Sequence, residues 1–279
     1  MLKTRLVTAA VALGLVLAAL FLLPPRGFAL AVLAVLAVGA HEWSRLAGFG
    51  RGTSILFVAA FIAGALALVL APGAGFERGW PPAIVLRVCG TATAFWLLVA
   101  TPWVVRRWGT RNVAALAVAG WIVLAGAFVA LVELQARSPW LLLAAMAIAW
   151  IADTAAYFSG RAFGRRKLAP LVSPGKTWEG VYGALVAVAL YATLLAFAAP
   201  ALAPVATTAG RVLAWVLFAV AVAGLSIVGD LYESLQKRIA GLKDSGALLP
   251  GHGGVLDRID ALVAAMPPLA CAAVLTLAA

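Results

Sequence analysis

The sequence predicts an all-α, polytopic integral membrane protein with about nine transmembrane helices. Of its 279 residues, 65% are hydrophobic and only 11% are charged, and long apolar segments recur from one end of the chain to the other. A soluble domain cannot bury that much apolar surface, whereas a lipid bilayer is a matching solvent for it. The segments are too long and too uniformly apolar for barrel strands, and the bilayer core has no water to satisfy backbone groups. We therefore expect the spans to be helices.

Nine apolar segments are expected to form these helices, and most approach the roughly 20 residues that a helix needs to cross the hydrocarbon core. The first has the basic flank of a signal peptide, but no convincing cleavage site follows, so we expect it to remain as a helix. The second is short and needs His41 and Glu42, interpreted as an interfacial helix end, to span; a re-entrant hairpin is the alternative. The segments are residues 6–23, 28–40, 55–71, 83–105, 113–132, 140–157, 181–199, 212–228 and 261–277.

The distribution of Lys and Arg predicts the orientation. If nine helices alternate, sixteen of the 21 basic residues lie on one side and four on the other, with Arg87 inside the fourth span. Such an excess marks the cytoplasmic side. We therefore expect the polar loops to face the cytoplasm, and the membrane itself is expected to be a bacterial inner membrane. The net charge of +11 follows mostly from this topology, with attraction to anionic membrane lipids as a secondary effect. Nucleic acid is not expected as a partner, because the basic residues are scattered over loops.

A single membrane domain, residues 1–279, is expected, and its two halves differ in composition. Residues 1–149 contain no aspartate and only three glutamates, so we interpret them as a helical scaffold. Residues 150–279 contain all five aspartates and the two longest polar loops, so we expect the chemistry there. Cys89 and Cys271 lie in apolar segments without metal or disulfide spacing and are expected to be core residues.

The first polar region, residues 153–180, allows two interpretations of its SPGKT segment at 173–177. The segment is expected to form a turn before a helix, with Ser173 or Thr177 as the N-cap and Glu179 in the first turn. A turn with free backbone N–H groups and Lys176 also resembles an anion cradle, although it lacks the P-loop spacing. Taken alone, the pattern slightly favours the helix start.

The second polar region, residues 230–260, gathers five acidic and four basic residues in an otherwise almost uncharged chain. Charge beside a membrane is costly and is usually kept for function. If the preceding helix continues, Asp230, Glu233, Ser234 and Lys237 fall along one face. Glu233 and Lys237 can form an i,i+4 ion pair. Asp230 has no basic residue at i+4, which indicates a bound cation.

The end of this region combines an irregular turn with two further carboxylates. Three glycines within residues 251–254 make a helix improbable and allow the main chain to approach phosphate oxygens closely. Asp257 and Asp260 follow at helical spacing. Because Asp230 and Asp257 lie at the ends of adjoining helices joined by a returning loop, they can converge. Two carboxylates with loop carbonyls and water suit Mg²⁺, and the surrounding Lys and Arg residues suit nucleotide phosphates. A salt-bridged loop without chemistry is the alternative.

The same residues resemble the signature of the phosphatidate cytidylyltransferase (CDP-diacylglycerol synthase) family, S-x-x-K-R-x4-K-D-x-[small]-x-x-[apolar]-P-x-H-G-G-x-x-D-R-x-D. Gln236 departs from it, since the family more often has an apolar residue there. Residues 153–157, 164–170 and 173–180 are also similar to the family, so the resemblance covers about the last half of the chain. The matching residues are Ser234, Lys237, Arg238, Lys243, Asp244, Gly246, Leu249, Pro250, His252, Gly253, Gly254, Asp257, Arg258 and Asp260.

The resemblance implies a nucleotidyltransferase of phospholipid biosynthesis that joins CTP to phosphatidic acid and releases pyrophosphate. It implies that Asp230 and Asp257 hold Mg²⁺, with a second cation such as K⁺ nearby. A phosphate nucleophile needs no strong base, so His252 is expected to position groups rather than to accept a proton. The implied catalytic residues are Lys237, Arg238 and Lys243, which neutralise the triphosphate, and Asp244, His252 and Asp260, which orient the loop or metal water. The implied substrate-binding residues are Ser173, Lys176, Thr177, Ser234, Gly253, Gly254 and Arg258.

A lipid substrate also implies a site at headgroup depth that opens sideways between helices. Asp153 either lines that pocket or is a partner of Arg161 or Lys176. Monomer and homodimer are both left open, and Arg87 and His41 are assigned no function.

Three other functions would also use aspartates in a membrane. A CDP-alcohol phosphatidyltransferase needs a D-G-x-x-A-R run, which does not occur here. A CTP-dependent polyprenol or lipid kinase would transfer the γ-phosphoryl group and release CDP. A transporter would ordinarily place its aspartates near mid-bilayer, whereas here they cluster at one face.

Overall fold

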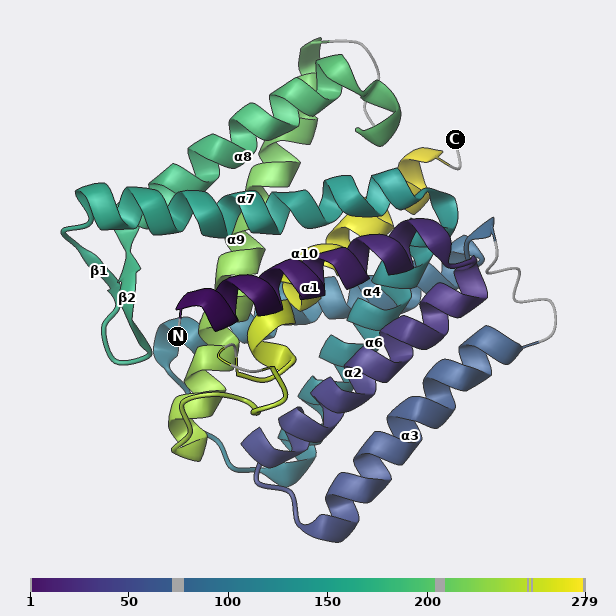
Figure 1. The fold of residues 1–279 in the computed structure, drawn as a ribbon, viewed down its shortest axis with the longest axis vertical. Helices are drawn as coiled ribbons and strands as arrows, with labels where there is room; N and C mark the ends of the chain where they lie inside the picture. The colour runs from purple at the N-terminus through teal and green to yellow at the C-terminus, as the bar shows by residue number, and fades with distance from the viewer. Residues whose placement is uncertain (1, 72–77, 204–208, 250, 252, 278–279) are drawn as a thin grey trace.

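The computed structural model describes residues 2–71, 78–203, 209–249, 251 and 253–277. In these ranges the chain is a bundle of apolar helices (Figure 1). Eight of the described helices are long and apolar enough to cross a membrane, and residues Val7–Leu22 of the first helix form a shorter apolar stretch. The α-helices are α1 (Leu2–Leu22), α2 (Pro25–Leu46), α3 (Arg51–Leu70), α4 (Pro82–Phe95), α5 (Thr101–Arg106), α6 (Val113–Arg137), α7 (Pro139–Phe163), α8 (Trp178–Ala198), α9 (Ala209–Ala240) and α10 (Leu256–Leu277). The predicted all-α membrane fold is confirmed.

The second and eighth predicted segments are longer in the structure than in the prediction. α2 is a continuous helix of 22 residues that includes His41 and Glu42, and at 1.5 Å per residue it is about 33 Å long, enough to span. The re-entrant alternative for residues 28–40 is therefore wrong. α9 continues beyond residue 228 to Ala240, so Asp230 and Lys237 share one helix, as expected.

The fourth span is irregular in its middle and contacts the helices that carry the signature. A π-turn, η2 (Trp96–Ala100), separates α4 from α5, and Pro102 just after it lacks the N–H that a regular helix would use. Trp96 donates its indole N–H to the Val263 carbonyl of α10 at 3.1 Å. The ring of Trp96 also packs edge-on against Tyr232 of α9, with centroids 5.6 Å apart. The N-terminal half thus packs directly on α9 and α10.

Loops from distant parts of the chain meet at one end of the bundle, which we call the basic end: residues 46–51, 106–113, 163–178, 240–249, 251 and 253–256. Arg111 donates to the Ile239 carbonyl and Arg238 to the Val172 carbonyl, each at 3.3 Å. In Figure 1 the β1–β2 hairpin and the loop after α9 both lie toward the left of the view. The structure therefore brings the two predicted polar regions to the same end.

The SPGKT segment is a strand rather than a turn. β1 (Lys167–Ala169) pairs antiparallel with β2 (Ser173–Thr177). The predicted turn is wrong because the chain reverses earlier, just after Pro170, and residues 173–177 then return along β1. The predicted helix start is confirmed, since the Thr177 hydroxyl accepts a hydrogen bond from the Gly180 N–H at 3.1 Å.

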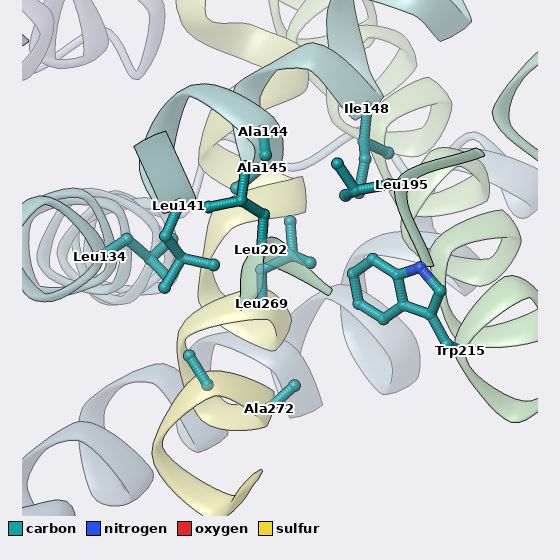
Figure 2. A pocket seen from close by; sticks show the side chains of 11 residues that line it. Leu134, Leu141, Ala144, Ala145, Ile148, Leu195, Leu202, Trp215, Leu269 and Ala272 are labelled. Atoms are coloured by element: carbon teal, nitrogen blue, oxygen red, sulfur yellow. The ribbon is translucent and has the colours of Figure 1, made fainter. Parts of the chain in front are cut away.

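A narrow apolar cavity lies among side chains of α6, α7, α8, α9 and α10, away from the basic end. Figure 2 shows the residues that line it. Trp215, on its wall, directs its indole N–H to the Ala192 carbonyl at 3.1 Å. The described residues that line the cavity include no carboxylate and no basic side chain, so it belongs to the apolar core. They are Leu134, Leu141, Ala144, Ala145, Ile148, Leu195, Leu202, Trp215, Leu269, Ala272 and Ala273.

Candidate active site

Asp257, in the first turn of α10, binds several parts of the signature at once. Its Oδ1 accepts a hydrogen bond from Lys237 Nζ at 2.6 Å. Its Oδ2 accepts from the backbone N–H and the hydroxyl of Ser245, both at 2.9 Å, and from the Gly254 N–H at 2.8 Å. An acidic side chain is also favoured at a helix N-terminus by the helix dipole. Asp257 therefore fixes the loop between α9 and α10 to both helices.

Lys237 bridges two carboxylates at the end of α9. Its Nζ lies 2.6 Å from Asp257 Oδ1 and 2.6 Å from Glu233 Oε2. The predicted Glu233–Lys237 pair is confirmed. The Lys237 side chain is only 12% exposed, so these attractions are screened less than those of surface pairs.

Asp230 has a basic partner, contrary to the expectation from the sequence. Lys176 Nζ lies 2.5 Å from Asp230 Oδ2, and Ser234 donates its hydroxyl to Asp230 Oδ1 at 3.2 Å. The expectation was wrong because it considered only the i+4 position of the same helix, whereas the lysine comes from β2. The pair joins the hairpin to the 230–260 region.

Close packing of α9 on α10 brings more carboxylates together. A Cβ at Gly229 would lie 2.9 Å from the Ala264 side chain and would overlap the Asp260 carbonyl, so glycine permits this approach. Asp260 and Asp153 each interact electrostatically with Asp230. Asp153 of α7, Asp230 of α9 and Asp260 of α10 are therefore near one another at the basic end, and we call these three residues the acidic cluster.

Of the two partners considered for Asp153, the structure favours Lys176. Asp153 interacts electrostatically with Lys176, whereas the Arg161 guanidinium donates to the Tyr157 hydroxyl at 3.3 Å. The same lysine thus balances Asp153 and Asp230.

The described ranges contain no group of three or more His, Cys, Asp and Glu side chains arranged to hold a metal ion. Mg²⁺ in nucleotide enzymes usually takes only one or two carboxylates and completes its coordination with water and substrate phosphates. A candidate Mg²⁺ site on this chain therefore rests on a pair of carboxylates.

The glycines of the signature make room for the protein's own carboxylates. Gly253 has φ +80°, and a Cβ there would lie 2.6 Å from Asp257 Oδ2. A Cβ at Gly254 would collide with the Ser245 hydroxyl and the Glu42 carboxylate. The sequence pattern correctly indicated a close approach to this turn, but the expectation that phosphate is the approaching group is not needed to explain the glycines.

Glu42, from α2, is the residue that sequence reasoning missed. Its side chain is 3% exposed. Its carboxylate accepts hydrogen bonds from the N–H groups of Val255 (3.0 Å) and Leu256 (2.8 Å) and from the Ser245 hydroxyl (2.9 Å). Residues 1–149 therefore contribute a buried carboxylate to the signature loop. The available signal was an acidic residue within an apolar segment, where charge is costly.

Glu179 anchors the hairpin to the start of α8. It accepts hydrogen bonds from the backbone N–H groups of Arg165 and Arg166, at 3.0 and 3.2 Å, and from the Arg166 side chain at 3.3 Å. The hydrogen bond that the exposed Arg166 guanidinium donates to the Glu179 carboxylate raises the pKa of Arg166 above its ordinary value. This anchor fixes β2, and with it Lys176, beside α9.

Comparison with known sequences gives the family. The profile described as "Cytidylyltransferase family" matches residues 3–276. The chain belongs to this family. It is similar to the phosphatidate cytidylyltransferases of Haemophilus influenzae, 38% identical over 282 residues (96% of each chain), and of Pseudomonas aeruginosa, 43% identical over 276 residues (97% of this chain and 96% of the other). A shorter match to the phosphatidate cytidylyltransferase of Thermotoga maritima is 43% identical over 118 residues, 42% of this chain and 43% of the other.

The remaining predicted site residues of this cytidylyltransferase-family chain lie at the basic end, apart from two that are outside the described residues. Arg238, Lys243, Asp244 and Arg258 are exposed there. Asp260 accepts a hydrogen bond from the Ala261 N–H at 2.8 Å, and Ser173 begins β2. Pro250 and His252 lie outside the described residues. The roles assigned to these residues stay predictions.

Proposed function

We propose that this chain is a phosphatidate cytidylyltransferase, which converts CTP and phosphatidic acid into CDP-diacylglycerol and pyrophosphate. The observation that supports this most strongly is its similarity, over nearly its full length, to two enzymes of that name. The cluster of Lys176, Asp230, Lys237 and Asp257 at the basic end supports the same conclusion, because phosphate chemistry depends on charge neutralisation and positioning.

The reaction is one nucleotidyl transfer. A phosphate oxygen of phosphatidic acid attacks the α-phosphorus of CTP and forms a new P–O bond. The bond between the α-phosphorus and the bridging oxygen to the β-phosphorus breaks, and pyrophosphate leaves with that electron pair. The nucleophile is already an anion, so a strong general base is not required. On this chemistry, Lys237 and Arg238 serve by neutralising the triphosphate, and His252 by positioning.

The donor set at the basic end fits Mg²⁺. Asp230 and Asp257 provide hard oxygen ligands on two packed helices, and such pairs of carboxylates bind Mg²⁺ together with phosphates. Asp230 and Asp257 would hold the ion, which would supply neutralisation of triphosphate charge; a second cation such as K⁺ is part of the same proposal. In the structure Lys176 and Lys237 balance the two aspartates. These two ammonium groups are therefore close enough to the proposed site to turn to phosphate oxygens.

A groove on α7 supports entry of the lipid from the side. It has a volume of about 330 Å³ and is lined by Ala147, Trp150, Ile151, Thr154 and Ala155. The groove is open and mainly apolar, which suits an acyl chain, and Thr154 at its end is the neighbour of Asp153. The headgroup of a lipid in this groove would lie beside the acidic cluster and Lys176.

The placement of the protein in the cell follows from the same features. The helices make it an integral membrane protein. We propose that the membrane is a bacterial inner membrane and that the basic end faces the cytoplasm, where CTP is available, because the excess of Lys and Arg lies at that end. A homodimer stays a prediction, which the mass of the purified protein in detergent checks.

The experiment that tests the function uses purified protein in detergent with CTP and phosphatidic acid, with and without Mg²⁺. We expect pyrophosphate and CDP-diacylglycerol in equal amounts, and only with a divalent cation. CTP labelled on its α-phosphate should label the lipid, whereas CTP labelled on its γ-phosphate should not. Transfer of the γ label with release of CDP would identify a lipid kinase instead, and absence of any lipid product would refute the proposal.

A further inference from the structure

Glu42 connects the N-terminal half of the chain to the loop that carries the signature. It lies in the last two turns of α2 and is 3% exposed. Its three hydrogen-bond donors belong to Ser245, Val255 and Leu256, more than 200 positions away in the sequence. The two backbone donors are N–H groups at the start of α10, which have no partner within their own helix. Glu42 therefore caps α10 from another helix.

The Ser245 hydroxyl links Glu42 to Asp257. It lies 2.9 Å from Glu42 Oε2 and 2.9 Å from Asp257 Oδ2. A hydroxyl has one proton and donates to one acceptor at a time, so the two hydrogen bonds of the Ser245 hydroxyl are alternatives and the two carboxylates compete for the same donor. A displacement of Glu42 must change the hydrogen bonding of Asp257.

Two glycines of the signature fit closely around the Glu42 carboxylate. A Cβ at Gly246 or at Gly254 would collide with Glu42 oxygens. Gly246 and Gly254 thus both lie directly against this side chain, and the need for small residues at both positions follows from it. This observation is independent of the hydrogen bonds.

Within the described part of the chain, Glu42 forms no ion pair, and its charge is balanced by hydrogen bonds alone. A buried carboxylate is costly unless its oxygens are well satisfied. Hydrogen bonds to a charged group are stronger and more directional than neutral ones. Such a group fixes a backbone more rigidly than apolar contacts would.

We propose that Glu42 is a positioning residue for nucleotidyl transfer: it holds the start of α10 and, through Ser245, sets the orientation of the Asp257 carboxylate. This inference rests on the proposed function. It assigns a role in the reaction to the N-terminal half, in which neither the signature motif nor the upstream polar region lies. It predicts that disturbing Glu42 impairs the reaction of bound substrates more than it impairs binding of the lipid.

The test compares Glu42→Gln with Glu133→Gln, a matched control at the opposite end of the bundle. Glutamine keeps the shape of glutamate, but its NH₂ group cannot accept a hydrogen bond and would face a backbone N–H. We expect Glu42→Gln to lower kcat by about 10- to 100-fold, the range seen when the hydrogen-bond partner of a metal-ligating side chain is removed. The KM for phosphatidic acid should change by less than about twofold. Glu42→Asp should recover part of the loss. Glu133→Gln should retain the wild-type kcat.

Two further measurements separate positioning from a simple loss of structure. Ser245→Ala removes the link but leaves the backbone cap, so its effect on kcat and that of Glu42→Gln should be non-additive in a double-mutant cycle. Trypsin cleavage after the exposed Lys243 reports on the loop without any turnover; it should be faster in Glu42→Gln and unchanged in Glu133→Gln. If Glu42→Gln fails to fold, Ser245→Ala takes its place in the kinetic test.

Two results would overturn the inference. One is a wild-type kcat in folded Glu42→Gln or, if that variant does not fold, in Ser245→Ala. The other is a loss of activity that only matches the loss of folded protein. A wild-type chain that makes no CDP-diacylglycerol, while the Lys243 cleavage rates still differ, would instead refute the proposed function and leave the role of Glu42 in the loop intact.

Discussion

Two buried glutamates, one near each end of the bundle, hold distant backbone segments in different ways. Glu133 of α6 is fully buried; it accepts the Trp80 N–H at 2.7 Å and pairs with Arg137, one turn later on its own helix, at 2.6 Å. Glu42 of α2 also accepts backbone N–H groups, but it has no basic partner in the described ranges and shares Ser245 with Asp257.

On the proposed function, the difference indicates that Glu42, and not Glu133, is coupled to the reaction. The charge of Glu133 is balanced locally, so its environment is self-contained and serves the packing of an apolar end. The position of Glu42 depends on the signature loop, and the loop depends on Glu42. Residues 1–149, predicted from their composition to be a helical scaffold, therefore also contribute to the candidate site in residues 150–279.

The largest expected effect is at Asp257, the centre of the basic-end network. Asp257→Asn removes the charge facing Lys237 and places an NH₂ group among N–H donors, so turnover should fall by about 100- to 1,000-fold. Asp230→Asn should have a similar effect. The measurement is CDP-diacylglycerol formation by protein that elutes as a single folded species in detergent. Full activity in purified Asp257→Asn would remove the metal-binding assignment of Asp257. It would also remove the reason to connect Glu42 with the reaction.

A smaller effect is expected at Lys237, which bridges Glu233 and Asp257. Lys237→Ala leaves two partly buried carboxylates without their cation, which is destabilising, and it removes a positive charge near the proposed triphosphate site. The kcat/KM for CTP should fall by about tenfold or more, while the preference among lipid substrates stays the same. Lys237→Arg, which keeps the charge, is the control. Its kcat/KM for CTP should lie between the values of the wild type and of Lys237→Ala. Unaltered KM and kcat in Lys237→Ala would contradict its predicted role.

At the opposite end, Glu133→Gln should affect stability alone. Loss of the charged hydrogen bonds to Trp80 and Arg137 should lower the free energy of unfolding by about 2 kcal/mol. Unfolding in detergent measures this, and kcat per folded molecule should match the wild type. A selective loss of kcat at this position would break the distinction between the two ends.

The smallest effect is expected at the cap of α8. Thr177→Ala removes the hydroxyl that accepts the Gly180 N–H, and a lost N-cap costs about 1 kcal/mol. If Thr177 also binds a phosphate, as the resemblance implies, the KM for CTP or phosphatidic acid should rise as well. A change in stability without a change in either KM would restrict Thr177 to the cap.

The number and type of the helices were predictable because apolar composition decides them directly. The Glu233–Lys237 pair and the Thr177 cap were predictable for a similar reason, since both depend on residues three or four positions apart. Each of these features is local in the sequence.

The contacts that shape the site were not predictable, because they join residues that are distant in the sequence. The partner of Asp230 comes from a hairpin, and the cap of α10 comes from α2. The Gly-rich turn showed that something approaches the backbone closely, but not that the approaching groups are Glu42 and Asp257. Periodicity gives no information on such pairs; only the packing of α2 and β2 against α9 and α10 does.

The most direct test of the account is to locate bound CTP on the chain. A photoreactive CTP analogue, crosslinked to purified protein with Mg²⁺ present and mapped by mass spectrometry, reports the site without turnover. The account predicts adducts within residues 173–177 or 230–260 that are lost when excess CTP competes and that weaken in Asp257→Asn. Competable adducts confined to the opposite end, around Arg137 or Trp215, would contradict it.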